Sequence, residues 1–205
     1  KLAHEATVAE YKALRAQIEP HFLFNALNTI SSFCRTNPLR AGELIINLSN
    51  YFRQTLKRQE DFVALYEELD FVESYLCIEK ARFGNRLSVN VEIPEGLMDI
   101  KMPVFILQPI IENSIKHGIL PQENGGVVNL NASDCGNVVE FSIADSGVGM
   151  SEERLEEVCL KWPGIGLKNV NDRLKLLYGQ DSALNLNTTL GTGTTVSFRI
   201  PKEVM

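Results

Sequence analysis

The sequence predicts an α+β fold in which an N-terminal helical hairpin is followed by an α/β sandwich, a mixed sheet covered by helices on one face. Apolar residues recur at helical spacing as far as about residue 57, which indicates amphipathic helices. Beyond residue 86, short stretches of alternating apolar and polar residues are separated by helical stretches, which indicates a half-buried sheet with covering helices. We assign the helical domain to residues 1–65 and the sandwich to residues 66–205.

The helical domain is expected to be a hairpin. Its first helix spans about residues 2–33, and Pro20 either kinks or restarts it, because proline lacks the N–H that a helix interior needs. A bend there either serves access to the next residue or merely fits the packing. Asn37 is expected to cap a second helix over residues 38–57, with Pro38 at its first position. One hairpin cannot cover apolar residues on both of its sides, so we expect a homodimer through these helices, a four-helix bundle.

The remaining elements follow from the same patterns. A third helix is expected over residues 66–83, with Gly84 as its stop. Alternation over residues 87–93 indicates the first strand of the sheet. The other expected strands are 127–130, 138–144, 184–186 and 195–200, and the other expected helices are 104–117, 151–160 and 166–178.

One histidine of the first helix has the surroundings of a reactive group. His21 and Asn25 are one helical turn apart and share a polar stripe with Asn28, while the neighbouring positions are apolar. A histidine imidazole is largely neutral near pH 7, so it has a free nitrogen that can attack phosphorus. A lone histidine on a helix is more often structural. A functional role of His21 is supported only by motifs in the rest of the chain.

Composition argues against several classes of function. The net charge of −6 and the lack of a basic run argue against binding of nucleic acid. The four cysteines are widely spaced without a Cys-x-x-Cys pair, so we expect reduced thiols rather than a zinc site or disulfides. No apolar run approaches the ~20 residues of a membrane helix, and no signal peptide is found. Because the chain begins at Lys1, we expect a fragment of a longer protein.

Four short motifs follow one another in the second half of the chain. They are Glu112-Asn113-Ser114-Ile115-Lys116-His117-Gly118, Asp145-Ser146-Gly147-Val148-Gly149-Met150, Gly164-Ile165-Gly166-Leu167-Lys168-Asn169-Val170 and Gly191-Thr192-Gly193-Thr194-Thr195. Each glycine motif alone is a weak signal. In this order the four resemble the N, G1, G2 and G3 boxes of the Bergerat-fold ATPases. With Pro20-His21-Phe22-Leu23-Phe24-Asn25 in front, the chain resembles the LytS-type sensor histidine kinases from about residue 10 to residue 201.

The resemblance implies ATP and Mg²⁺ as cofactors. Asn113 offers a neutral amide oxygen and is implied as the ligand of the metal that bridges the phosphates. Lys116 and His117 are either phosphate contacts or solvated cations at a helix end. Glu112 either activates water, as the acid at this place does in Bergerat-fold ATPases, or orients the histidine or shapes the metal shell.

The glycine motifs are implied to hold the rest of the nucleotide. Asp145 directly follows a predicted strand, and the resemblance makes its carboxylate the acceptor of the adenine amine, with Gly147 and Gly149 letting the backbone approach the base. Free N–H groups at the start of the 166–178 helix can hold phosphate oxygens. The implied contacts there and in the last motif are Gly164, Gly166, Leu167 and Thr194, with Lys168 and Arg173 as further phosphate or hairpin-docking candidates. The lid departs from the family pattern, since it is short and Trp162 stands where small residues are usual.

The implied activity is autophosphorylation of His21 by ATP and transfer of the phosphoryl group to an aspartate of a response-regulator receiver domain. Phe22 follows His21 where many kinases carry an acid, so activation of the imidazole falls to Glu19 or Glu112. Asn25 is implied to position water for dephosphorylation of the receiver. The alternatives are a Bergerat-fold serine kinase of the anti-sigma kind and a non-catalytic, nucleotide-binding dimeric scaffold. We expect this part to lie in the cytoplasm and to reach the cell membrane only through a missing N-terminal sensor region.

Overall fold

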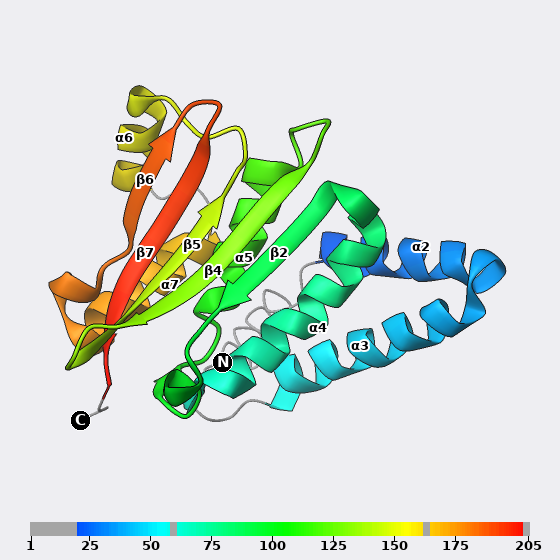
Figure 1. The fold of residues 1–205 in the computed structure, drawn as a ribbon, viewed down its shortest axis with the longest axis horizontal. Helices are drawn as coiled ribbons and strands as arrows, with labels where there is room; N and C mark the ends of the chain where they lie inside the picture. Colours follow the sequence, from blue (N-terminus) through cyan, green and yellow to red (C-terminus); the bar gives the residue numbers. More distant parts are fainter. Residues whose placement is uncertain (1–19, 58–60, 162–164, 203–205) are drawn as a thin grey trace, which may run out of the picture. The chain divides into compact units, whose positions relative to one another are not determined.

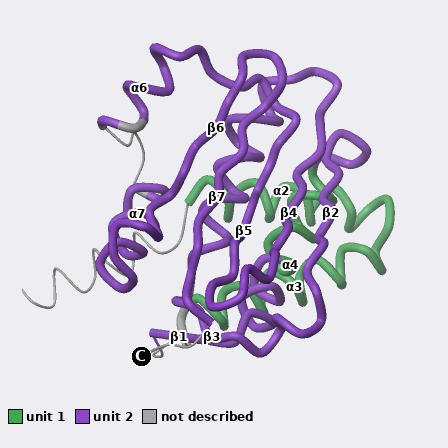
Figure 2. The backbone as a smooth tube through the Cα atoms, turned by 60° about the vertical axis from the view of Figure 1, so that its left-hand side comes forward, with its two compact units in different colours: residues 1–59, 73–82 green, residues 60–72, 83–205 purple. Residues whose placement is uncertain are grey.

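The structure is a computed structural model that describes residues 20–57, 61–161 and 165–202. The chain forms two compact units, residues 1–59 with 73–82 and residues 60–72 with 83–205 (Figure 2). Helix α4 (Leu65–Phe83) contributes to both, because its residues 73–82 pack with the helical hairpin. The functional division predicted after residue 65 stays a prediction, since the units reflect packing alone.

The first unit contains the predicted hairpin (Figure 1). Helix α2 (Pro20–Thr36) buries Phe22, Ala26 and Ile30, which lie one helical turn apart. Asn37 caps helix α3 (Pro38–Lys57) as predicted, because its side-chain oxygen accepts a hydrogen bond from the N–H of Arg40 at 3.1 Å. The helix predicted before Pro20 and the bend at that proline lie outside the described residues.

Aromatic rings form the centre of this unit. The ring of Phe22 lies 4.9 Å from that of Tyr51 on α3 and 5.1 Å from that of Tyr75 on α4. All three side chains are buried. Other apolar side chains of the two helices stay on the surface of the single chain, with exposed fractions from 49% to 67%: Phe24, Leu27, Ile45 and Ile46.

The second unit is built on a five-stranded mixed sheet in the order β2-β4-β5-β7-β6 (Figure 1). The β2–β4 pair is parallel, and the other neighbouring pairs are antiparallel. The strands are β2 (Leu87–Glu92), β4 (Gly126–Asp134), β5 (Val138–Asp145), β6 (Asn185–Thr189) and β7 (Gly193–Pro201). The predicted strands of the sandwich are therefore confirmed, with ends that differ by a few residues.

Helices cover one face of this sheet, as predicted. Helices α5 (Leu107–Asn113) and α7 (Ile165–Tyr178) lie behind the sheet in Figure 1, and α6 (Glu152–Lys161) lies next to β6. Every second residue of β5 is buried, which is the pattern of a strand with one covered face. Among the described helices, none combines the length and the apolar character that a membrane span requires.

Two local features differ from the sequence prediction. Residues expected in a connecting segment form a short strand, β1 (Phe62–Ala64), which pairs antiparallel with β3 (Lys101–Pro103). The helix predicted over residues 104–117 begins only at Leu107, because Phe105 has a φ of 56° and interrupts the helix pattern. Its continuation after Asn113 is a π-helix, η3 (Ser114–Ile119), which is wider than an α-helix.

Candidate active site

His21 and Asn25 lie together on α2. The side-chain nitrogen of Asn25 is 3.2 Å from Nδ1 and 3.3 Å from Nε2 of His21, within hydrogen-bond distance of the ring. Their spacing of four residues produces this contact. His21 is exposed, so a reactant from outside the helices can reach the imidazole.

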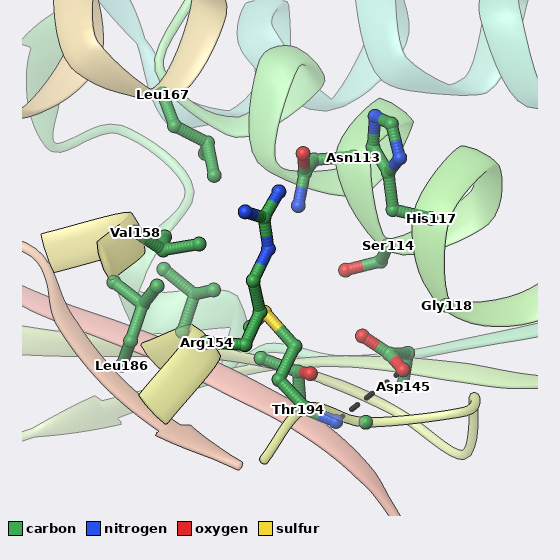
Figure 3. A pocket seen from close by; sticks show the side chains of 13 residues that line it. Asn113, Ser114, His117, Gly118, Asp145, Arg154, Val158, Leu167, Leu186 and Thr194 are labelled. Carbon is green, nitrogen blue, oxygen red and sulfur yellow. Dashed lines mark hydrogen bonds between the residues drawn. The ribbon is translucent and has the colours of Figure 1, made fainter. Parts of the chain in front are cut away.

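The second unit contains a cavity of about 290 Å³ (Figure 3). Its walls come from α5 and η3, from α6, from the start of α7 and from the ends of β5, β6 and β7. Six of the residues predicted from the motifs line it: Asn113, His117, Asp145, Gly149, Leu167 and Thr194. Residues that are up to 81 positions apart in the sequence therefore meet at one site.

Asp145 ends β5 and is 8% exposed. Its Oδ1 accepts hydrogen bonds from the N–H groups of Gly147 at 2.9 Å and Thr194 at 3.3 Å. The other oxygen lies on the side of Ser114 and the cavity (Figure 3). Burial raises the pKa of the Asp145 carboxyl, and the donors Gly147, Thr194 and Ser114 oppose part of the rise. One oxygen is thus held by the backbone, while the other faces the cavity.

Two glycines allow η3 to approach this carboxylate. A Cβ atom on Gly118 would lie 2.4 Å from Oδ1 of Asp145, and one on Gly147 would lie 2.3 Å from the backbone of Gly118. The N–H of Val148 also donates to the carbonyl of Gly118 at 3.1 Å. The structure therefore places Gly147 against η3, where it does not line the cavity, and explains its small size by this contact.

Helices α5 and η3 bring the side chains of Asn113, Ser114 and His117 to the cavity. Asn113 is the last residue of α5, and its amide points into the cavity in Figure 3. The N–H of Leu120 donates to the carbonyl of Ile115 at 2.9 Å, the five-residue step of a π turn. This turn contains His117 and the close contact of Gly118, so the irregular helix belongs to the site.

Other predicted residues in the described parts of the chain are not among those that line the cavity. Glu112 and Lys116 form an ion pair at 2.6 Å, and Gln108 donates to the second carboxylate oxygen of Glu112 at 3.2 Å. Gly166 is exposed in the first turn of α7, where a Cβ would lie 3.6 Å from Pro109. Gly164 and Trp162 lie outside the described residues, and so does Glu19.

Arg154 is a cavity residue that the sequence reasoning misses. It lies in α6, and its guanidinium points across the cavity toward Asn113 in Figure 3. It also pairs with Glu157 on the same helix. The residues around Arg154 are mostly acidic, which is the pattern of a solvent-exposed helix. Only its position a few residues after the Asp145 motif could have indicated a role. The apolar lining is missed as well. Met150 belongs to the second motif but has no predicted role, and the sequence pattern of Val158, Leu186 and Val196 is that of ordinary core residues.

A mixed sheet is covered on one face by helices, and an asparagine of a covering helix and an aspartate at a strand end line one cavity. Comparison with known families assigns the class of domain. The family model described as "Histidine kinase-, DNA gyrase B-, and HSP90-like ATPase" matches residues 98–204. A second model, described as "Histidine kinase", matches residues 9–87. The chain belongs to the histidine kinase family.

Curated relatives agree with this assignment. The chain is 39% identical to the sensor protein LytS of Bacillus cereus over 96% of its own length and 34% of the relative. It is 41% identical to the sensor histidine kinase YpdA of Escherichia coli over 99% of its length and 36% of the relative. It thus spans about a third of the curated relatives that it matches.

Two solved structures share the fold. The histidine kinase domain of the Erythrobacter litoralis EL346 blue-light activated histidine kinase has a TM-score of 0.51 at 18% identity, over 93% of this chain and 92% of that chain. The catalytic domain of histidine kinase ThkA has a TM-score of 0.54 at 20% identity, over 70% and 97%. At these identities the likeness shows the fold alone, and it confirms the predicted fold class.

Proposed function

We propose that this chain binds ATP in the cavity, transfers the γ-phosphoryl group to His21 and passes it to an aspartate of a response-regulator receiver domain. The observation that carries the proposal is Asp145, a buried carboxylate with one oxygen held by the backbone and the other facing the cavity. The family supports it, and so do the names of the relatives, a sensor protein and a sensor histidine kinase.

The cavity residues fit an adenine nucleotide. The oxygen of Asp145 that faces the cavity can accept a hydrogen bond from the adenine amino group. The base would lie against the apolar lining, with the bare backbone of Gly149 next to it. The phosphates are proposed to lie near the start of α7, where free N–H groups and the helix dipole favour negative charge. The phosphate contacts are proposed to be His117, Gly164, Gly166, Leu167 and Thr194.

Asn113 is proposed to hold Mg²⁺. Its amide oxygen is a hard neutral ligand, and phosphate oxygens would supply the negative charge. Mg²⁺ neutralises charge on the phosphates when bound. Glu112 is proposed to shape the metal shell rather than to activate water, because Lys116 and Gln108 both bind its carboxylate and fix its direction. Lys116 is accordingly proposed to act through Glu112.

His21 is proposed to be the nucleophile. A nitrogen of the neutral imidazole attacks the γ-phosphorus while the bond from phosphorus to the bridging oxygen breaks, so a nitrogen–phosphorus bond forms and ADP leaves. The proton on the other ring nitrogen passes to solvent. Asn25 contacts the ring and is proposed to hold its direction, and later to position water for dephosphorylation of the receiver. The phosphoryl group is transferred either within one chain or between the two chains of a dimer.

We further propose a homodimer through α2 and α3. A second copy would cover the apolar side chains that these helices expose, which a four-helix bundle buries. The match to about a third of each sensor relative supports a longer protein, in which this part lies in the cytoplasm and another region is anchored in the membrane.

Incubation with γ-labelled ATP and Mg²⁺ tests the proposed function. We expect label on the protein that is stable in alkali and lost in acid, as phosphohistidine is. Label on serine would instead indicate a serine kinase of the anti-sigma kind. Nucleotide binding without any label, in a dimer with its sensor region present, would indicate a non-catalytic scaffold.

Gly118→Ala is expected to damage the cavity. The added Cβ would displace the Asp145 carboxylate, which is held by two backbone donors, so we expect a loss of stability of about 1–3 kcal/mol and about tenfold weaker nucleotide binding. Thermal unfolding and titration with ATP measure both. Gly42→Ala is the control, because nothing lies within 4 Å of its Cβ and alanine favours the α3 helix. Unchanged nucleotide affinity in Gly118→Ala would contradict the account.

Arg154→Ala is expected to weaken ATP binding about fivefold to tenfold and to affect adenosine much less, because a guanidinium binds phosphate oxygens. Titrations with ATP and adenosine provide the measurement. Arg199→Ala is the matched control, since Arg199 forms a surface ion pair with Glu140 on the sheet. Equal losses for both ligands would show that Arg154 does not contact the phosphates.

A further inference from the structure

The start of α5 has an unusual backbone. Phe105 has a φ of 56°, the one positive value of a non-glycine residue in the described parts of the chain. Ile106 directly precedes α5 and has an apolar side chain that makes no capping hydrogen bond. The N–H groups at this helix start therefore need an acceptor from another segment, because buried backbone donors are nearly always paired.

Glu68 of α4 supplies that acceptor. Its Oε2 accepts from the N–H of Phe105 at 3.1 Å, and its Oε1 accepts from the N–H groups of Ile106 at 2.9 Å and Leu107 at 3.2 Å. Glu68 is 0% exposed. A left-handed residue followed by helical residues aims successive N–H groups at one point and forms an anion-binding nest, to which the helix dipole adds. In this chain the nest is filled by the protein's own carboxylate.

Helices α4 and α7 both contact the residues that precede α5. The ring of Phe105 meets the ring of Phe71 on α4 edge-on at 5.1 Å. Arg173 of α7 donates to the carbonyl of Val104 at 2.7 Å. Elements α4 and α7 therefore both define where α5 begins.

We propose that Glu68 is a positioning residue for the nucleotide site, because its carboxylate fixes the start of α5 and thereby the place of Asn113 at the other end. The helix has seven residues and is about 10 Å long, so a shift of its start is passed to its end. The inference rests on the proposed role of Asn113 as the metal ligand. Glutamine at position 68 keeps the size but offers one acceptor oxygen and turns N–H donors toward the nest, so it cannot replace the carboxylate.

Amide hydrogen exchange of the nucleotide-free chain tests the contact itself. In Glu68→Gln we expect the amides of residues 105–107 to exchange at least about tenfold faster than in the wild type. Glu67→Gln is the matched control, because the Glu67 carboxylate accepts from the N–H of Ala64 at 2.9 Å and serves the start of α4 instead. Equal exchange at 105–107 in the wild type and Glu68→Gln would overturn the inference.

The dependence of ATP binding on Mg²⁺ tests the consequence. We expect the wild type and Glu67→Gln to bind ATP more tightly with Mg²⁺, and Glu68→Gln to lose most of this gain, about tenfold, at a temperature where all are folded. Glu68→Asp, which keeps the charge, should recover part of it. An affinity loss that is equal with and without Mg²⁺ would show general disruption and overturn the positioning role. If the wild type does not bind ATP, the proposed function fails, and the exchange experiment still decides the role of Glu68 at α5.

Discussion

His21→Gln is expected to abolish transfer of label from γ-labelled ATP, with a loss of more than about a thousandfold in rate. Glutamine is similar in size and polar, but its amide nitrogen has no lone pair that can attack phosphorus. Because His21 lies on α2 and the cavity belongs to the second unit, the affinity for ATP should stay within about twofold of the wild type. Autoradiography and titration with nucleotide measure the two quantities.

The two results are informative together. Loss of label with unchanged binding supports His21 as the phosphate acceptor. Acid-labile label that persists in His21→Gln would place the acceptor at another histidine and refute the assignment. Loss of binding along with label would show that the substitution disturbs the whole chain, and the helical content should then fall as well.

Asp145→Asn is expected to weaken nucleotide binding by about 2–3 kcal/mol, roughly 30- to 150-fold in Kd. The asparagine oxygen can keep the hydrogen bonds from Gly147 and Thr194, which both go to Oδ1 in the wild type. The amide NH₂ then replaces the oxygen that faces the cavity, and it opposes the adenine amino group donor to donor. Titration with ATP and with a purine nucleotide that lacks the amino group measures the change, and equal weakening of both would contradict adenine recognition by Asp145.

Asp145→Asn is expected to stabilise the folded chain, although it weakens nucleotide binding. Burial raises the pKa of Asp145 in the folded chain, so the ionised carboxylate is disfavoured there. The stability that the protonated Asp145 carboxyl contributes is fully present at pH values below its pKa in the unfolded chain. This stability is lost as the pH rises through the higher pKa of the folded chain. Neutral asparagine has no such cost, so Asp145→Asn should melt at a higher temperature than the wild type at pH 7, and the difference should shrink in acid. A lower melting temperature of the variant at pH 7 would contradict this.

Local patterns were sufficient for most elements. Asn37 and Pro38 define the start of α3, Gly84 with a φ of 55° ends α4, and alternation locates the strands. The start of α5 could not be predicted, because the positive φ of Phe105 depends on Glu68, which is 37 residues away in the sequence. The pairing of β1 with β3 is also non-local, since neither three-residue strand has a pattern of its own.

Some residues of the candidate site could be predicted from local motifs, and others could not. Asn113 and Asp145 belong to recognisable motifs, and both line the cavity. Gly118 lies in a quoted motif, but its need to be glycine comes from the Asp145 carboxylate at 2.4 Å from a Cβ, a contact between distant segments. Arg154 has no motif, and its place at the cavity depends on how α6 packs. Contacts between separate elements could therefore not be predicted from the sequence alone.

The most direct test of the central claim is a crystal structure of the chain with a non-hydrolysable ATP analogue and Mg²⁺. We predict the adenine amino group at ~2.7–3.2 Å from the Asp145 carboxylate and the metal on the amide oxygen of Asn113. A nucleotide bound outside this cavity, or bound in it with the base away from Asp145, would contradict the account.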